Sequence, residues 1–219
     1  MNELKPTSDG IYKKDDEFYT MNLNPGSDVY GEELIQENNF EYRHWNPDRS
    51  KLGAFLKIVD SLPLTQDIDV LYLGAGDGTT VSHISDIVTH GKIFSVEVAP
   101  KPYRNLLKLS EKRKNIYPIM SDAKKPEKYG NLVNKVDFLY QDISQRDQVE
   151  IFIKNFRFLK EDHYGFLVVK SRSIDVTKPP KEIFDETEEK LLEKGISVED
   201  IIDINRWQKG HAIIITKND

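Results

Sequence analysis

Short apolar runs alternate with segments of helical periodicity from residue 70 to the end of the chain. In the first such pair, the run 70–73 is followed at once by glycines and then by apolar residues at positions 81, 84, 87 and 88. A short apolar run beside turn residues is typical of a buried strand, and the spacing after it is typical of a helix with one buried face. The alternation predicts an α/β fold built on a largely parallel sheet.

The same pattern predicts the other regular elements. The predicted strands are 70–73, 93–96, 116–119, 136–140, 164–169, 198–204 and 212–216. The predicted helices are 48–61, 81–88, 101–114, 126–133, 147–159 and 181–194, the first with Asn46 as its N-cap and Pro47 in its first turn. The connection 205–210 is short, so the last two strands should be antiparallel, with the final strand running against the others. The expected architecture is a seven-stranded, Rossmann-like sheet.

Residues 1–45 have a different character. Short extended pieces at 10–12, 18–23 and 40–43 surround a turn-forming segment at 24–27. We expect a small antiparallel β subdomain over 1–45 with a structural role, followed by the main domain over 46–219.

Composition narrows the class of protein. The chain has 219 residues, of which 38% are hydrophobic and 31% charged, enough for one sizeable domain with a small appendage. No apolar run approaches the roughly 20 residues of a membrane span, and the first residues lack signal-peptide character. The absence of cysteine excludes disulfides and thiolate metal sites. We therefore expect a cytoplasmic protein without membrane contact.

The net charge of −6 bears on possible partners. Proteins that bind nucleic acid unaided are usually basic, because phosphate contacts dominate the affinity. Either this chain does not contact nucleic acid, or partner molecules hold the nucleic acid for it.

The glycine turn after the first strand of the main domain indicates a cofactor. Gly74, Gly76 and Gly78 form a G-x-G-x-G pattern, whereas a dinucleotide fingerprint would need a glycine at the position of Thr79. The pattern therefore suits S-adenosylmethionine (SAM) better than a dinucleotide. Glu97 ends the next strand, where a carboxylate would bind ribose hydroxyls. A tight strand-to-helix turn without a ligand is the structural alternative.

Polar residues gather where the predicted strands end. Ligands of open α/β sheets bind beyond the carboxyl ends of the strands, and here those ends are marked by Gly74, Glu97, Asp122, Asp142 and Lys170. His211 starts the reversed last strand at the same edge, and the helix before the sheet can bring Lys51 there. Singly, Asp142 could be a helix cap, Lys170 a solvated strand end and His211 a turn residue. Their convergence favours function.

This set of side chains suits methyl transfer to a hydroxyl group. In such an in-line displacement, alignment of the reacting atoms supplies most of the acceleration. A lysine near another cation can act as a base or stabilise a developing alkoxide, and a neighbouring carboxylate can fix its geometry. No His, Asp and Glu residues have the spacing of metal ligands, so we expect no metal.

Longer motifs resemble the fibrillarin family. Residues 41–52 match its E-Y-R-x-W-N-P-x-R-S-K-L signature, residues 71–88 resemble its cofactor motif, and 170–178 resemble the segment after its catalytic strand. Residues 24–26 and 29–32 match the N-terminal part of archaeal members. The chain departs from the family pattern at 142–146, where D-I-S-Q-R replaces D-V-A-Q-P, at Gly210, commonly aspartate, and in the cofactor turn.

The resemblance implies a class I SAM-dependent fold and RNA 2′-O-methyltransferase activity. The family acts on ribosomal and transfer RNA as the catalytic subunit of archaeal box C/D ribonucleoproteins, in pre-rRNA and tRNA processing. The catalytic set falls on Lys51, Asp142, Lys170 and His211. Cofactor contacts fall on Thr79, Thr80, Glu97, Val98, Asp122, Ala123, Asp142, Ile143, Ser144 and Gln145, in addition to Gly74 and Gly76 of the turn.

The resemblance also implies partners that explain the acidic charge. A guide RNA, a Nop-family scaffold protein and an L7Ae-type kink-turn-binding protein would hold the target RNA. Two other hypotheses stay open from the residues alone: a scaffold-docking module that has lost its chemistry, and a dinucleotide oxidoreductase, which Thr79 disfavours.

Overall fold

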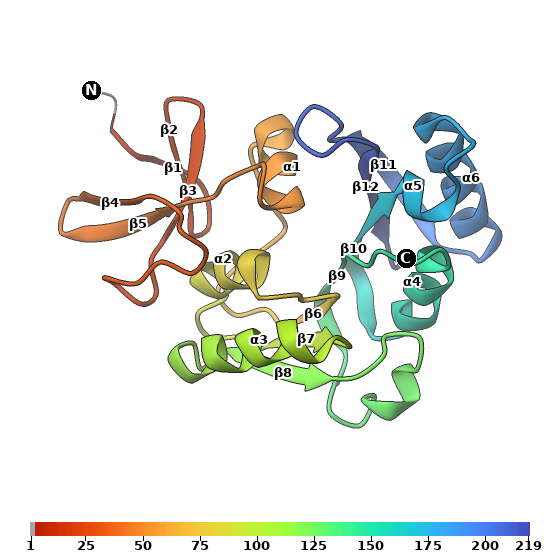
Figure 1. Ribbon diagram of the computed structural model, residues 1–219, viewed down its shortest axis with the longest axis horizontal. Helices are drawn as coiled ribbons and strands as arrows, with labels where there is room; N and C mark the ends of the chain where they lie inside the picture. Colours follow the sequence, from red (N-terminus) through yellow and green to blue (C-terminus); the bar gives the residue numbers. More distant parts are fainter. Residues whose placement is uncertain (1–2) are drawn as a thin grey trace.

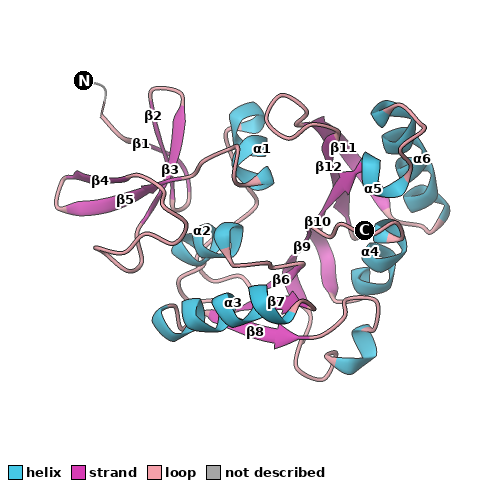
Figure 2. Ribbon diagram, in the orientation of Figure 1, coloured by secondary structure: helices cyan, strands magenta, loops and turns pink. Residues whose placement is uncertain are grey.

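Two β-sheets organise the computed structural model, which describes residues 3–219 (Figures 1 and 2). Met1 and Asn2, the first residues of the predicted N-terminal subdomain, lie outside the described residues. The larger sheet has seven strands in the order β11-β12-β10-β9-β6-β7-β8. These are β6 (Val70–Leu73), β7 (Ile93–Glu97), β8 (Ile116–Met120), β9 (Val136–Gln141), β10 (Leu159–Lys170), β11 (Ser197–Asp203) and β12 (His211–Lys217).

The strand directions confirm the predicted α/β sheet. Strands β10, β9, β6, β7 and β8 pair in parallel, whereas β12 is antiparallel to both β10 and β11. The final strand therefore runs against the rest and begins at the edge where the parallel strands end.

Alternation along the strands builds a core on each face of this sheet. Val70 and Tyr72 of β6 pack in one cluster, and the intervening Leu71 and Leu73 pack in the other. Because successive side chains of a strand point to opposite faces, a sheet buried on both sides needs apolar residues at every position. The run 70–73 meets this need.

Helices cover both faces (Figure 1). On one side lie α1 (Lys51–Val59), α2 (Thr79–Ile87) and α3 (Pro100–Lys112), and on the other α4 (Gln148–Phe156), the short α5 (Ser171–Ile174) and α6 (Pro180–Glu193). None of the helices formed by residues 3–219 combines the length and apolar character that crossing a bilayer requires.

The smaller sheet precedes α1 in the chain. Its antiparallel strands have the order β1-β2-β3-β5-β4. They are β1 (Lys5–Ser8), β2 (Ile11–Lys14), β3 (Glu17–Met21), β4 (Leu34–Glu37) and β5 (Phe40–His44). The apolar pattern identified β2, β3 and β5 but missed β1 and β4, in which no residue is fully buried.

The start of α1 differs from the prediction. Asn46 does not cap this helix: its side chain accepts a hydrogen bond from the Asp48 amide within a turn, at 2.8 Å. The helix begins only at Lys51, because the Ser50 hydroxyl accepts from the Gly53 amide and acts as the N-cap. Lys51 is consequently the first helical residue.

The predicted helix 126–133 is also wrong in extent. Only Pro126–Lys128 forms a single 3₁₀ turn. The Gly130 amide closes this turn onto Pro126 O at 2.8 Å, and the Leu132 and Val133 amides then close separate turns on Tyr129 O. Glycine disfavours helix propagation, so consecutive turns replace a helix.

A buried charge cluster joins the two sheets. Arg43 of β5 is fully buried and donates to Glu32 Oε1 at 2.6 Å and to Asp86 Oδ2 of α2 at 2.7 Å. Arg113 donates to the other oxygen of Asp86, Oδ1, at 2.5 Å. Buried charges persist when they are paired and hydrogen-bonded. The cluster therefore fixes the smaller sheet against α2.

His83 adds an uncharged connection at the same junction. Its ring stacks on Trp45 with centroids 4.7 Å apart, and its nitrogens hydrogen-bond with Thr20 and Tyr30. Burial, followed by the guanidinium groups of Arg43 and Arg113, holds the pKa of His83 well below its usual range. The ring is therefore neutral where it meets these cations.

Replacing Arg43 by methionine is expected to lower the free energy of unfolding by about 3–5 kcal/mol, because the Glu32 carboxylate stays buried without its cation. Urea unfolding measures the change. Lys190→Met is the matched control: it breaks the exposed pair with Glu150, where the loss should stay below about 1 kcal/mol. Equal losses in the two variants would contradict a supporting role for the buried cluster.

Candidate active site

Three charged side chains from separate elements meet at the carboxyl edge of the large sheet. Lys51 Nζ donates to Asp142 Oδ2 at 2.9 Å, and Lys170 Nζ lies 2.6 Å from Asp142 Oδ1. Lys51 starts α1, Asp142 follows β9 and Lys170 ends β10. The structure thus brings together Asp142 and Lys170, which the strand-end pattern singled out, with Lys51, which we expected from the helix before the sheet.

Backbone pairing places the acid and the second lysine. β9 and β10 are parallel neighbours, so their carboxyl ends lie side by side. The Asp142 amide donates to Leu73 O at 2.9 Å, which continues the pairing with β6, and the Lys170 amide donates to Gln148 Oε1 at 2.9 Å.

A chain of hydrogen bonds fixes the start of α1. Trp45 Nε1 donates to Ser50 Oγ at 2.9 Å, and the hydroxyl groups of Ser50 and Thr80 lie 2.9 Å apart. Gly53 allows this close packing, because a β-carbon there would lie 2.9 Å from Trp45 Cδ1. These contacts fix the N-cap of α1, so the backbone of the adjacent Lys51 is held in place.

The electrostatics of the cluster favour an ionised acid and a weakened ammonium. Burial raises the pKa of Asp142, but the ammonium groups of Lys51 and Lys170 outweigh it and hold that pKa below its usual value. Burial is the largest effect and lowers the pKa of Lys170. Asp142 raises that pKa in part and Lys51 lowers it again, so that it stays below its usual value. Lys170 consequently releases a proton more readily than a solvated lysine.

His211 lies at the same edge as predicted. It is the register partner of Lys170 in the antiparallel pair of β10 and β12, and its Nδ1 lies 2.8 Å from Lys209 O. Burial is the main cause that lowers the pKa of His211, so the ring is neutral at pH 7. The Gln208 amide group donates to Pro47 O and Asp48 O, at 3.0 and 2.9 Å, and ties the loop before His211 to the approach to α1.

A cavity of about 340 Å³ opens beside Asp142. Ten of the twelve residues predicted to bind the cofactor line it: Gly74, Gly76, Glu97, Val98, Asp122, Ala123, Asp142, Ile143, Ser144 and Gln145. Val96 and Ser121 also line it, although the sequence analysis did not name them. Val96 directly precedes Glu97, and Ser121 directly precedes Asp122. Their position next to a predicted cofactor-binding acid is the sequence signal that could have identified them.

Thr79 and Thr80 do not line this cavity. Thr79 lines a second cavity on α3, and the Thr80 hydroxyl is engaged with Ser50. A direct cofactor contact by these two residues stays a prediction.

Ser144 stands where the family pattern has alanine. Its hydroxyl accepts a hydrogen bond from Lys170 Nζ at 2.7 Å, and Asp142 O accepts a longer one at 3.4 Å. The lysine therefore has several acceptors on the same short segment, and its amino group is held at the mouth of the cavity.

A comparison with protein families decides the identity of this site. The family model described as fibrillarin matches residues 3–219. The chain belongs to the fibrillarin family.

Individual family members agree. A fibrillarin-like rRNA/tRNA 2′-O-methyltransferase from Methanosarcina barkeri is 45% identical over 99% of both chains. The solved structure of Aeropyrum pernix fibrillarin with natively bound S-adenosyl-L-methionine is 40% identical, with a TM-score of 0.85, covering 99% of this chain and 100% of that one. A fibrillarin/Nop5p complex contains a chain that is 39% identical, with a TM-score of 0.86, covering 96% of this chain and 98% of its own.

The lining of the cavity fits SAM. Both Glu97 oxygens accept one backbone hydrogen bond, from Gly76 N at 2.8 Å and from Ala99 N at 2.7 Å, and keep lone pairs for ribose hydroxyls. Gln145 Oε1 is buried and has no hydrogen-bond partner within residues 3–219, so it offers an acceptor to a ligand. No group of three or more His, Asp or Glu side chains in this part of the chain could hold a metal ion.

Gly74→Ala is expected to destabilise the chain more than Gly76→Ala. Both glycines have left-handed φ angles, +82° and +55°, where alanine costs about 1–2 kcal/mol. Only at position 74 would the new β-carbon also lie 2.6 Å from Asp142 O; at Gly76 no neighbouring atom lies within 4 Å. Urea unfolding without cofactor measures both losses in the free energy of unfolding. Equal values would contradict the prediction, because they would show that the Asp142 backbone moves aside at no cost in free energy.

Proposed function

We propose that this chain transfers the methyl group of SAM to the ribose 2′-hydroxyl of ribosomal and transfer RNA. The observation that carries the proposal is the Asp142 carboxylate, which lines the cofactor cavity and is held between two ammonium groups. The names of the relatives point to the same reaction and the same RNA classes.

The cofactor would be held by residues that line this cavity. We assign ribose hydroxyls to the Glu97 carboxylate, and the adenine to Asp122, Ala123 and the neighbouring Val98. Gly74 and Gly76 allow close approach to the backbone, and the segment from Asp142 to Gln145 closes the cavity. When bound, SAM supplies a methyl group activated by its sulfonium charge.

The lysines and the acid would prepare the accepting hydroxyl. The bond between the methyl carbon and the sulfonium sulfur would break as the ribose oxygen bonds to that carbon, with the demethylated cofactor as the leaving group. The hydroxyl proton would pass to Lys170 Nζ, which accepts it in the neutral form that burial favours. Asp142 holds Lys170 and Lys51 in fixed positions. The Lys51 ammonium stabilises negative charge that develops on the oxygen. We assign to the neutral His211 the transfer of the released proton to solvent.

The acidic chain would receive its RNA within an assembly. With a net charge of −6, it lacks the general attraction for phosphates that unaided binding requires. We propose a Nop-family scaffold as its protein partner, in line with the fibrillarin/Nop5p complex. A box C/D guide RNA and an L7Ae-type kink-turn-binding protein would complete the particle, which we place in the archaeal cytoplasm.

Replacing Lys170 or Asp142 by alanine is expected to reduce methyl transfer by about 100-fold or more, because each variant loses a positioned proton-transfer group or its orienting partner. SAM should still bind to the Lys170 variant, as measured by calorimetry. Lys178→Ala is the control, since within residues 3–219 the ion pairs of Lys178 are with Glu182 and Glu186, outside the site. Unchanged turnover in the Lys170 and Asp142 variants would favour a docking module without chemistry.

The purified chain alone should bind SAM but methylate RNA poorly. Adding guide RNA, scaffold and kink-turn-binding protein should restore transfer to one ribose next to the guide duplex, mapped by primer extension. Efficient, site-specific transfer by the chain without these partners would refute the proposal that the partners hold the RNA while this chain carries out the methyl transfer.

A further inference from the structure

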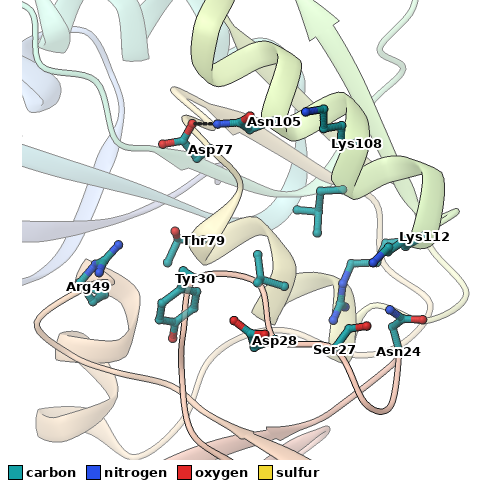
Figure 3. Close-up of a pocket in the computed structure, with 13 residues that line it drawn as sticks. Asn24, Ser27, Asp28, Tyr30, Arg49, Asp77, Thr79, Asn105, Lys108 and Lys112 are labelled. Carbon is teal, nitrogen blue, oxygen red and sulfur yellow. Dashed lines mark hydrogen bonds between the residues drawn. The ribbon is translucent and has the colours of Figure 1, made fainter.

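A second cavity, of about 400 Å³, lies on the other side of the cofactor turn. Figure 3 shows it between the loop that carries Asn24 and Tyr30, the turn that carries Asp77 and Thr79, and α3. Gly76 lines the cofactor cavity, whereas Asp77 and Thr79 line this one. One short turn therefore separates the two cavities.

Three unpaired cations face this cavity. Lys108 and Lys112 stand one helical turn apart on α3, and Arg49 stands on the opposite side (Figure 3). All three are exposed, and no carboxylate within residues 3–219 lies within 4.0 Å of their charged groups. Most lysines of α6 and of the strand ends have such a partner, for example Lys181 with Asp185 and Lys217 with Asp162. These cations are therefore available to an anionic ligand.

The two carboxylates of the cavity are already engaged. Asp28 Oδ2 accepts from the Gly31 amide at 2.8 Å, and Asp77 Oδ1 accepts from the Asn105 amide group at 2.9 Å. Arg113, which also lines the cavity, is neutralised by Asp86. Both carboxylates keep their negative charge, but Arg49, Lys108 and Lys112 outnumber them, so the lining is net positive on a chain whose net charge is −6.

An aromatic platform lies beside the cations. The Arg49 guanidinium sits over the ring of Tyr30, with its Cζ 5.6 Å from the ring centroid. The Tyr30 hydroxyl donates to His44 O at 3.1 Å, and burial raises its pKa to about 12, so the ring is neutral and fixed. Nucleobases stack on aromatic rings and on guanidinium planes.

We propose that this cavity binds the target RNA strand next to the methylated nucleotide. Phosphates would lie against Lys108 and Lys112, and one unpaired base would stack on the Arg49–Tyr30 platform. A volume of about 400 Å³ suits a single nucleotide rather than a duplex. The inference rests on the proposed function, because Arg49 of this cavity stands only two residues before Lys51, so a strand with its reacting ribose at Lys51 would extend into the cavity.

The decisive experiment compares two double variants in the reconstituted particle. Lys108→Ala with Lys112→Ala removes the cavity cations, and Arg104→Ala with Lys114→Ala removes two exposed cations of the same region that do not line it. We expect the cavity variant to raise the KM for target RNA several-fold, with kcat and the KM for SAM unchanged. The slope of log KM against log salt should fall by about 1.4, which is roughly 0.7 for each lost contact to a single strand.

Two variants of Arg49 test the platform. Arg49→Lys keeps the charge but loses the planar group, so it should raise the KM for RNA, whereas Arg49→Gln should raise it further. Equal KM values and salt slopes for the parent and the cavity variant would overturn the proposal.

Direct binding separates this proposal from the proposed function. Fluorescence anisotropy of a labelled single-stranded RNA with the isolated chain at low salt needs no catalysis. Loss of affinity in the cavity variant alone supports the RNA contact even if the particle methylates nothing. Equal affinity in both double variants overturns the contact while leaving methyl transfer intact.

Discussion

The site depends on one constraint, which is that two ammonium groups can share a confined space only with a carboxylate between them. Lys51 and Lys170 both lie within 3 Å of Asp142. Without the acid, their mutual repulsion in a partly buried setting would be severe. The three groups come from α1, the end of β9 and β10. Their two ion pairs therefore also fix the positions of these elements relative to one another.

The small N-terminal sheet reinforces that placement. Trp45, just after β5, holds Ser50 and thereby the first residue of α1, while Arg43 anchors the same strand to α2. α2 in turn begins at the cofactor turn, where the Thr80 hydroxyl meets Ser50. The sheet therefore fixes both Lys51 and the helix that follows the cofactor turn.

The cofactor turn has two functional sides. Gly74 and Gly76 line the cavity that fits SAM, and Asp77 and Thr79 line the cavity of the unpaired cations. The proposed RNA contact would explain how an acidic protein can act on RNA. A local positive surface beside the reacting group would orient the strand, while partners that hold the RNA would supply most of the binding energy. Orientation of this kind contributes mainly through alignment of the reacting atoms.

The sequence by itself determined the sheet, its reversed last strand and five residues that line the cofactor cavity (Gly74, Gly76, Glu97, Asp122 and Asp142), because strand periodicity and strand ends are local properties of the chain. The resemblance to the fibrillarin family added five more lining residues: Val98, Ala123, Ile143, Ser144 and Gln145. The catalytic roles of Lys51, Asp142, Lys170 and His211, and the domain boundary at residue 45, stay predictions. Only the tertiary structure decided that Ser50 rather than Asn46 caps α1, that Thr79 turns away from the cofactor cavity and that Ser144 holds Lys170. These outcomes depend on which distant groups a side chain meets, such as Trp45 with Ser50 or α3 with Thr79, and periodicity along the chain carries no record of such contacts.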